Sequence, residues 1–303
     1  MPRDYDIIGG AMKGCRIWRM IDTGTGGPSE NMALAEVMLQ GCLEGKSQPG
    51  LHWYTWSAPA VTLGYFQDVE ETVNRDACRT MGVRVVRRIT GGRAVVHHRD
   101  LSFSLVFPSN SDMIPAGIRG SYRTIAQGFV EGLNSLGIKA YLADVWDAGS
   151  LERQKRRLQP ACFLTRISSE ILVSGRKVIG FAQKRVGGWI LMQGTILMGV
   201  ERSLWKELLR YPEYMDAAGI RIKLAAGMAA LSEVAGREIR VRDLEDAVFN
   251  GLSAIIGIEF ERQRLSVDEQ AAAASLCADR YRDLVGCDGI PVCTSKGHHY
   301  RYG

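Results

Sequence analysis

Apolar residues three and four positions apart predict a series of amphipathic helices along the chain. We expect the first to begin at Pro28 and Ser29, which offer an N-cap, and to run on to Cys42. Further helices are predicted over residues 74–81, 121–136, 202–210, 241–255 and 267–284. Gly137 ends the second of these and Pro212 stops the third.

Short apolar runs between turn residues predict strands in the gaps between the helices. The runs over 51–57 and 60–66 are separated by Pro59 and indicate a β-hairpin that the helix at 74–81 follows. Residues 83–86, 94–97 and 101–107 predict a meander of three strands, in which Gly91 and Gly92 form the first turn. Further strands are expected over 139–146, 170–173, 178–185 and 189–200, with an edge strand over 259–264.

Composition narrows the class of protein. The chain has no run of about 18 apolar residues that could cross a membrane, and Arg3, Asp4 and Asp6 leave no apolar core for a secretory signal. Its seven cysteines are scattered, odd in number and without framework spacing, which predicts reduced thiols and a cytoplasmic protein. The net charge of +5 favours acidic partners but does not demand nucleic acid.

The glycine pair Gly91-Gly92 is the first candidate for chemistry. Arg87, Arg88 and Arg93 surround it, so backbone can approach a ligand closely while cations stand beside it, as in a pocket for an acidic or acyl group. The pair lacks the lysine and spacing of a nucleotide-binding loop, and a plain hairpin turn explains it equally well. The nearby His97 and His98 could act as a general base or form a pocket wall.

One motif carries a family resemblance. The run Arg87-Arg88-Ile89-Thr90-Gly91-Gly92-Arg93-Ala94-Val95-Val96-His97 resembles the acyl-pocket motif of the lipoate-protein ligase A and octanoyltransferase superfamily. Three upstream runs resemble the same family in the same order: Trp18-Arg19-Met20-Ile21-Asp22-Thr23-Gly24, Glu30-Asn31-Met32-Ala33-Leu34 and Leu63-Gly64-Tyr65-Phe66-Gln67. The resemblance implies the biotin and lipoate ligase catalytic fold, an α/β (α+β) domain with a largely antiparallel mixed sheet flanked by helices. We therefore expect a flexible arm over 1–15, an acyltransferase domain over 16–260, and a C-terminal helical extension and tail over 261–303.

A second block is similar to the LipM-type octanoyltransferases: Ala161-Cys162-Phe163, Ser169-Glu170-Ile171, Gly175 to Arg185, and Gln193-Gly194-Thr195. This resemblance implies that Cys162 is the nucleophile and that Lys177 lies at the acyl carbonyl. The implied substrate-binding residues are Arg87, Arg88, Gly91, Gly92, Arg93, His97, Gly180, Ala182, Gln193 and Gly194. ATP-using ligases usually carry Asn-Asp near Ser169-Glu170 and a third glycine at Arg93, and both differences favour a transferase.

The expected reaction has two steps and needs no cofactor or metal. Cys162 accepts an octanoyl group from octanoyl-acyl carrier protein, and a lysine of a lipoyl domain of a 2-oxoacid dehydrogenase E2 subunit, or of the glycine-cleavage H protein, then attacks the thioester. Exchange of one thioester for another costs almost no free energy, so ATP is not required. The basic residues Arg153 to Arg157 suit an acidic carrier, although a solvated basic loop explains them as well.

Other functions stay open. An ATP-dependent lipoate ligase would use the same fold with Lys177 at an acyl-adenylate. An amidotransferase would move the acyl group from H protein to a dehydrogenase subunit, and an adaptor would only bind acylated proteins. Ala35, the second histidine His98 and Phe181 depart from the family pattern, and Phe181 is expected to narrow or reshape the acyl pocket. The spacing of Cys287 and Cys293, near His298 and His299, does not match a zinc site.

Overall fold

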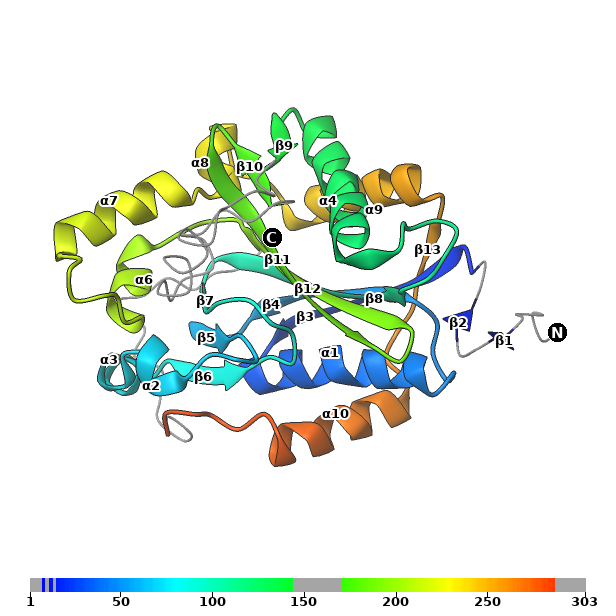
Figure 1. Cartoon of the computed structure of the whole chain (residues 1–303), viewed down its shortest axis with the longest axis horizontal. Helices are drawn as coiled ribbons and strands as arrows, with labels where there is room; N and C mark the ends of the chain where they lie inside the picture. The colour runs from blue at the N-terminus through cyan, green and yellow to red at the C-terminus, as the bar shows by residue number, and fades with distance from the viewer. Residues whose placement is uncertain (1–6, 9–10, 13–14, 144–169, 287–303) are drawn as a thin grey trace.

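The computed structural model describes residues 7–8, 11–12, 15–143 and 170–286 (Figure 1). The centre of the molecule is a mixed sheet of eight strands. In sheet order the strands are β13 (Glu259–Arg262), β3 (Ile17–Gly26), β4 (Gly50–Trp56), β8 (Asp100–Pro108), β12 (Trp189–Leu197), β11 (Arg176–Val186), β10 (Ile171–Val173) and β9 (Ala140–Leu142). The first three run parallel to one another and all the later pairs are antiparallel, which confirms the predicted fold class.

A smaller sheet stands beside the large one. Its strands, in order, are β6 (Arg84–Arg87), β5 (Ala60–Leu63) and β7 (Val95–His97). The short helices α2 (Val69–Thr72), α3 (Arg75–Met81), α6 (Arg202–Leu208), α7 (Ala217–Gly227) and α8 (Leu231–Ala235) lie at this end of the molecule (Figure 1). Two further strands, β1 (Ile7–Ile8) and β2 (Ala11–Met12), pair with each other in an antiparallel arrangement.

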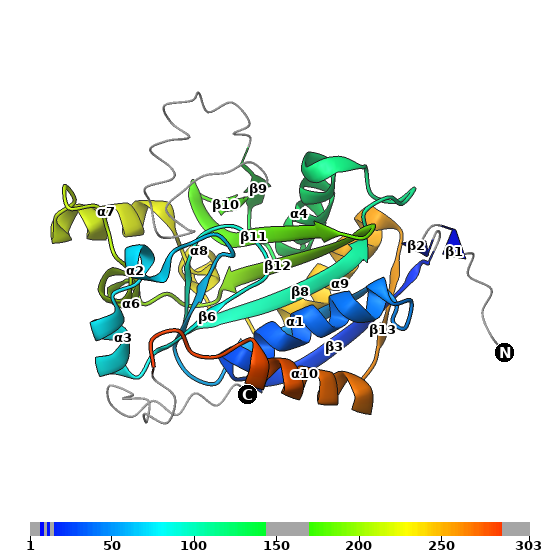
Figure 2. The ribbon, with the colours of Figure 1, turned by 60° about the horizontal axis from the view of Figure 1, so that its bottom comes forward.

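Helices cover both faces of the large sheet. On one face lie α4 (Gly117–Ser135) and α9 (Val241–Ile256), and on the other lies α1 (Pro28–Leu43) (Figure 1). Figure 2 shows α10 (Val267–Asp279) running beside α1 on the side away from the sheet. Because both faces are covered, every residue of β8 and of β12 is buried.

The two faces differ in chemistry, and the alternation of side chains along a strand explains why. On β8, Leu101, Phe103, Leu105 and Phe107 belong to the apolar core under α4 and α9. Ser102 and Ser104 alternate with them and therefore point toward the α1 side, where they are also buried. On β12, Gln193 and Thr195 alternate in the same way with the core residues Met192 and Ile196. Buried polar side chains thus line the α1 face where the candidate site lies.

Two predicted strand pairings are wrong. The expected hairpin of residues 51–57 and 60–66 does not form, because β4 belongs to the large sheet and β5 to the small one. The expected meander does not form either, since β5 separates β6 from β7, and β8 pairs with β4 and β12. In both cases the strands themselves are present, and long-range partners replace the local ones.

The helix predictions agree with the structure better than the predicted strand pairings do. The helices predicted over 74–81, 202–210, 241–255 and 267–284 correspond to α3, α6, α9 and α10, and α4 begins one turn before the predicted 121–136 helix. For α1 the N-cap is Gly27, with Pro28 as its first residue, because the Glu30 carboxylate accepts a hydrogen bond from the Gly27 amide at 2.8 Å. Helices α2, α7 and α8 were not predicted.

The C-terminal segment is tied to the rest of the fold. The buried Glu36 on α1 accepts hydrogen bonds from Tyr281 and Arg280. Further on, the Leu284 amide donates to the Val85 carbonyl at 2.8 Å. The division into an arm over 1–15, a catalytic domain over 16–260 and an extension over 261–303 stays a prediction. In the part of the chain described, no helix is long and apolar enough to cross a membrane.

Candidate active site

A pocket opens between the two sheets and α1. Its walls enclose about 380 Å³ of space free of protein atoms, part of it open to solvent. Six of the predicted substrate-binding residues line it together: Arg88, His97, Gly180, Ala182, Gln193 and Gly194. The rest of the lining is Met32, Tyr54, Trp56, Thr62, Val95, Phe181 and Thr195. Segments far apart in sequence therefore meet in one pocket.

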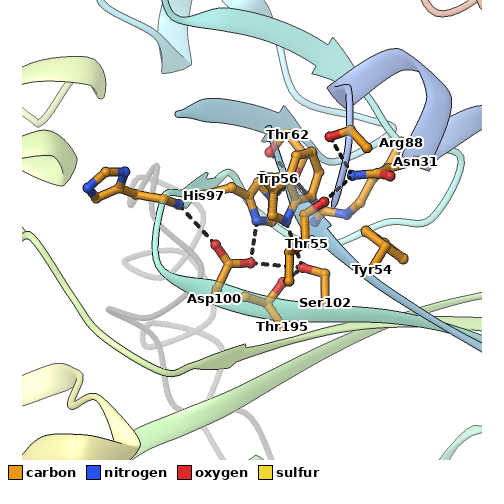
Figure 3. Close-up of polar contacts among 12 residues, drawn as sticks. Asn31, Tyr54, Thr55, Trp56, Thr62, Arg88, His97, Asp100, Ser102 and Thr195 are labelled. Carbon is orange, nitrogen blue, oxygen red and sulfur yellow. Dashed lines mark hydrogen bonds and ion pairs between the residues drawn. The ribbon is translucent and has the colours of Figure 1, made fainter. Parts of the chain in front are cut away.

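A hydrogen-bonded network centred on His97 builds one wall (Figure 3). The His97 ring is buried, with Nδ1 at 2.9 Å from Asp100 Oδ2 and Nε2 at 2.9 Å from Thr62 Oγ1. Ser102 Oγ donates to the same Asp100 oxygen at 2.8 Å, and Trp56 Nε1 donates to Ser102 Oγ at 3.1 Å. The Asp100 carboxylate and the Thr62 hydroxyl therefore each hold one ring nitrogen of His97. Both ring nitrogens are thus occupied, and His97 acts as a wall of the pocket.

Arg88 joins this network to the glycine turn. Its guanidinium is buried and donates to the Thr62 carbonyl and hydroxyl, each at 3.2 Å. It also donates to the Gly91 carbonyl at 2.7 Å and the Arg93 carbonyl at 2.8 Å. The side chain predicted to stand beside a bound acid is therefore engaged with backbone oxygens, and it fixes the conformation of the turn at the edge of the pocket.

The glycines of the turn are not equivalent. Gly92 has φ +85°, and a Cβ there would lie 2.9 Å from the Arg88 guanidinium and 3.4 Å from the Ala182 side chain. At Gly91 a Cβ would meet nothing within 4 Å. Gly64 packs against the turn, since a Cβ there would lie 2.0 Å from the Gly92 carbonyl oxygen. The close approach of the two backbones requires Gly64, and the positive φ favours glycine at Gly92, while Gly91 has open space beside it.

Arg87 holds a neighbouring loop. It donates to the Gly64 and Tyr65 carbonyls at 3.1 Å and also to the Gln67 carbonyl. In this loop Phe66 is 88% exposed and meets the Tyr65 ring edge to face, with centroids 5.0 Å apart. Arg87 was predicted to bind substrate, and the structure places its guanidinium on the loop beside the pocket.

The interior of the pocket is mostly apolar, and it holds a few polar side chains that contact one another. Thr90 Oγ1 donates to Gln193 Oε1 at 2.8 Å, and Gln193 Nε2 lies 3.6 Å from the Met32 sulfur. Burial raises the pKa of the Tyr54 hydroxyl to about 12, so this side chain is neutral. Such a lining accepts a neutral acyl chain without burying an unpaired charge.

Small residues leave the space that the pocket occupies. On β11, Gly180 and Ala182 present almost no side chain to it. Phe181 also lines the pocket, and its ring packs edge to face on Phe103 and Phe129 at 5.7 and 5.4 Å between centroids. A Cβ at Gly194 would lie 2.2 Å from the Phe103 ring, so this glycine is required by packing under the pocket floor.

Lys177 reaches the pocket side of the sheet because of a β-bulge. Lys177 pairs with Leu172 and Ile179 pairs with Ile171, so Val178 is the extra residue. Regular alternation would point Lys177 to the same face as Ile179, toward the core under α4 and α9. Its partner Leu172 lies on the opposite face, and Lys177 therefore shares the face of Gly180 and Ala182. Its side chain is buried and forms an ion pair with Glu170.

Cys162 and the basic residues Arg153 to Arg157 fall outside the described residues, as do Cys287, Cys293, His298 and His299. Within the described part of the chain, no group of three or more His, Cys, Asp or Glu side chains could hold a metal ion.

Sequence reasoning missed several residues of the site. Tyr54, Trp56, Thr62 and Thr195 line the pocket, Asp100 and Ser102 support it, and Glu170 pairs with Lys177. A signal was present, because Ser102, Ser104, Gln193 and Thr195 are polar residues alternating with large apolar ones in strands that are buried on both faces. Polar side chains at such positions need partners and often face a binding site.

Comparison with known proteins agrees with this geometry. Residues 27–253 match the family model of the lipoyl protein ligase A/B catalytic domain. The chain belongs to this family. Among curated members, it is 35% identical to the octanoyltransferase LipM of Symbiobacterium thermophilum over 276 residues, covering 89% of this chain and 96% of that protein. It is 33% identical to the LipM of Anoxybacillus flavithermus over 265 residues, covering 88% and 95%.

Solved structures of the lipoyl protein ligase A/B family share the fold. A lipoate-protein ligase A bound with ATP superposes with a TM-score of 0.69 at 22% identity, covering 86% of this chain and 94% of that chain. The bi-partite lipoate protein ligase from Thermoplasma acidophilum gives the same TM-score and identity, covering 86% and 92%. At this level of identity the likeness concerns the fold alone.

Proposed function

We propose that this chain is an octanoyltransferase of protein lipoylation that works through a cysteine thioester. The curated relatives that cover nearly the whole chain carry this activity in their names. The observation that carries the proposal is the position of Lys177, whose buried ammonium lies on the same face of β11 as the pocket residues Gly180 and Ala182. A buried cation on the same sheet face as a mostly apolar pocket suits a thioester, which has an apolar chain and a carbonyl that becomes negative during transfer.

In the first step the Cys162 thiolate attacks the carbonyl carbon of octanoyl-acyl carrier protein. The carbon–sulfur bond to the carrier breaks, and the carrier leaves as a thiol after taking up a proton. Lys177 stabilises the thiolate before the attack and the oxyanion during it. The octanoyl chain lies in the pocket bordered by Gly92, Ala182 and the His97 wall.

In the second step the neutral amine of an acceptor lysine attacks the Cys162 thioester. The amide bond forms, the bond to sulfur breaks, and one proton of the amine passes to the cysteine sulfur or to solvent. The proposed acceptors are the lipoyl domain of a dehydrogenase E2 subunit and the glycine-cleavage H protein. The reaction takes place in the cytoplasm and involves neither nucleic acid nor a membrane.

The transfer assay tests this proposal. Purified protein is mixed with octanoyl-acyl carrier protein and an acceptor domain, with and without ATP, and the acceptor mass is measured. We expect ATP-independent octanoylation that is lost in Cys162→Ala and kept in Cys277→Ala, a matched change at a partly buried cysteine beside α1. Labelling that requires ATP would indicate a lipoate ligase, and transfer that starts only from acylated H protein would indicate an amidotransferase.

A further inference from the structure

The ion pair of Lys177 with Glu170 is sealed from water. The two side chains are 1% and 7% exposed. Glu170 stands immediately before β10, the strand whose bulged pairing turns Lys177 toward the pocket face. The same short segment therefore sets both the direction of the lysine and the position of its counter-charge.

The backbone of Lys177 is fixed from two sides. It pairs with Leu172 on β10, and its carbonyl accepts a hydrogen bond from the Ala229 amide at 3.0 Å. The flexible part of this residue is thus its side chain. A lysine side chain has several rotatable bonds and loses rotamer entropy when it is fixed, so a partner at its tip decides where the ammonium sits.

Burial also affects the charge of the lysine. A buried ammonium without a counter-charge gives up its proton at lower pH than a solvated one. Neutral lysine would neither favour a thiolate nor stabilise an oxyanion. We infer that Glu170 is a positioning residue, which holds the Lys177 ammonium on the pocket face and keeps it charged during acyl transfer. The inference rests on the role of Lys177 in the proposed function.

The other charged groups near Lys177 are engaged with one another, among the residues described. Glu233 on α8 accepts a hydrogen bond from Arg202 at 2.8 Å and lies 3.6 Å from Arg176, the neighbour of Lys177 on β11. Arg202 also donates to the Met228 carbonyl at 3.1 Å, and Met228 pairs with Lys177 through a β-bridge. Glu233 is therefore a matched control, because it is a carboxylate near β11 that pairs with Arg202 and Arg176.

The test compares Glu170→Gln, Glu170→Asp and Glu233→Gln with the wild type in the transfer assay between pH 6 and pH 9. Glu170→Gln is expected to lower kcat about tenfold or more at pH 8, and to recover part of the loss at pH 6 where lysine is more easily protonated. KM for the acyl donor should change less than kcat. Glu170→Asp should recover part of the rate, and Glu233→Gln should match the wild type. A wild-type pH profile in Glu170→Gln would overturn the inference.

Two further measurements separate this role from a purely structural one. In the double variant Glu170→Gln with Lys177→Arg, the guanidinium stays charged at any of these pH values, so the added pH dependence should disappear. A carbon-13 NMR titration of the lysine Cε resonances reports on Lys177 without any acyl transfer. Its midpoint should fall in Glu170→Gln, or in Glu170→Asp if the first variant does not fold, and an unchanged midpoint refutes the pairing. If wild-type protein transfers no acyl group, the proposed function fails while this titration still tests the pair.

Discussion

The indole of Trp56 stacks on the imidazole of His97, with ring centroids 3.8 Å apart and planes inclined by 19°. The stack joins a strand of the large sheet to a strand of the small one at the pocket wall. Because the indole also donates to Ser102, which in turn donates to Asp100, the stack and the hydrogen bonds hold the same ring. His97 is therefore placed as a rigid wall, with both nitrogens engaged.

Replacing His97 tests this role. His97→Ala removes a hydrogen bond to a buried carboxylate and should lower the free energy of unfolding by about 1.5–3 kcal/mol. Chemical denaturation measures this loss. The variant should still form the Cys162 thioester when donor is saturating, because the nucleophile and Lys177 remain. Complete loss of the adduct in a folded variant would instead make His97 the general base.

Replacement by alanine should lower the stability of the protein at Gly64 and leave it nearly unchanged at Gly91. Gly64→Ala forces a methyl group against the Gly92 backbone, and overpacking of this kind costs about 1–3 kcal/mol or more. Gly91→Ala adds its methyl group to open space and keeps a permitted φ, so the midpoint of thermal unfolding should stay near that of the wild type. Equal destabilisation by the two changes would contradict the described turn.

Phe181 should limit the length of the acyl chain. It lines the pocket next to Gly180 and Ala182, and its ring packs on Phe103 and Phe129 on the α4 side of the sheet, so a smaller side chain is expected to let the pocket extend toward that side. Phe181→Ala is expected to raise the rate with decanoyl or dodecanoyl carrier protein relative to octanoyl carrier protein. Competition between donors, read by the mass of the acylated acceptor, measures this ratio. Phe181→Leu serves as the conservative control, and an unchanged preference in both variants would exclude Phe181 from length selection.

A buried carboxyl far from the pocket should make stability depend on pH. Burial, together with the nearby Asp22 carboxylate, raises the pKa of Glu245 from 4.5 to about 7. The folded state then binds the proton more tightly than the unfolded state, so stability falls as pH rises from about 4.5 to about 7. Glu245→Gln should remove this fall and stabilise the protein at pH 8 by at most about 3 kcal/mol, with little effect at pH 4. The exposed Glu213→Gln is the control, and parallel stability curves for Glu245→Gln and the wild type would refute the assignment.

The sequence predicted the helices and strands well and their partners poorly. Periodicity is a local property, so α3, α4 and α9 follow directly from apolar spacing. Strand pairing is decided by contacts between distant segments. In the small sheet β5 lies between β6 and β7, and β8, which follows β7 in the chain, belongs to the large sheet. The predicted meander was wrong because short connections suggested local pairing.

The sequence was also a limited guide to the pocket, because contacts between distant segments shape it. Motif similarity brought Arg88, His97, Gly180 and Gln193 together, although their spacing in the chain does not. It did not reveal that Arg87 and Arg88 donate to backbone carbonyls. The acceptors of Arg87 lie in another segment, and the Gly91 carbonyl comes within reach of Arg88 only because the turn folds back. The bulge at Val178 was equally hidden, since alternation alone assigns Lys177 to the wrong face.

The central claim is that an octanoyl group passes through Cys162, and intact-protein mass spectrometry tests it most directly. Wild-type protein is incubated with octanoyl-acyl carrier protein, without ATP or acceptor, and then digested to locate the adduct. We expect one octanoyl group on Cys162, released by hydroxylamine and by addition of the acceptor domain. Absence of the adduct on Cys162, with the acceptor still octanoylated when it is supplied, would contradict the account.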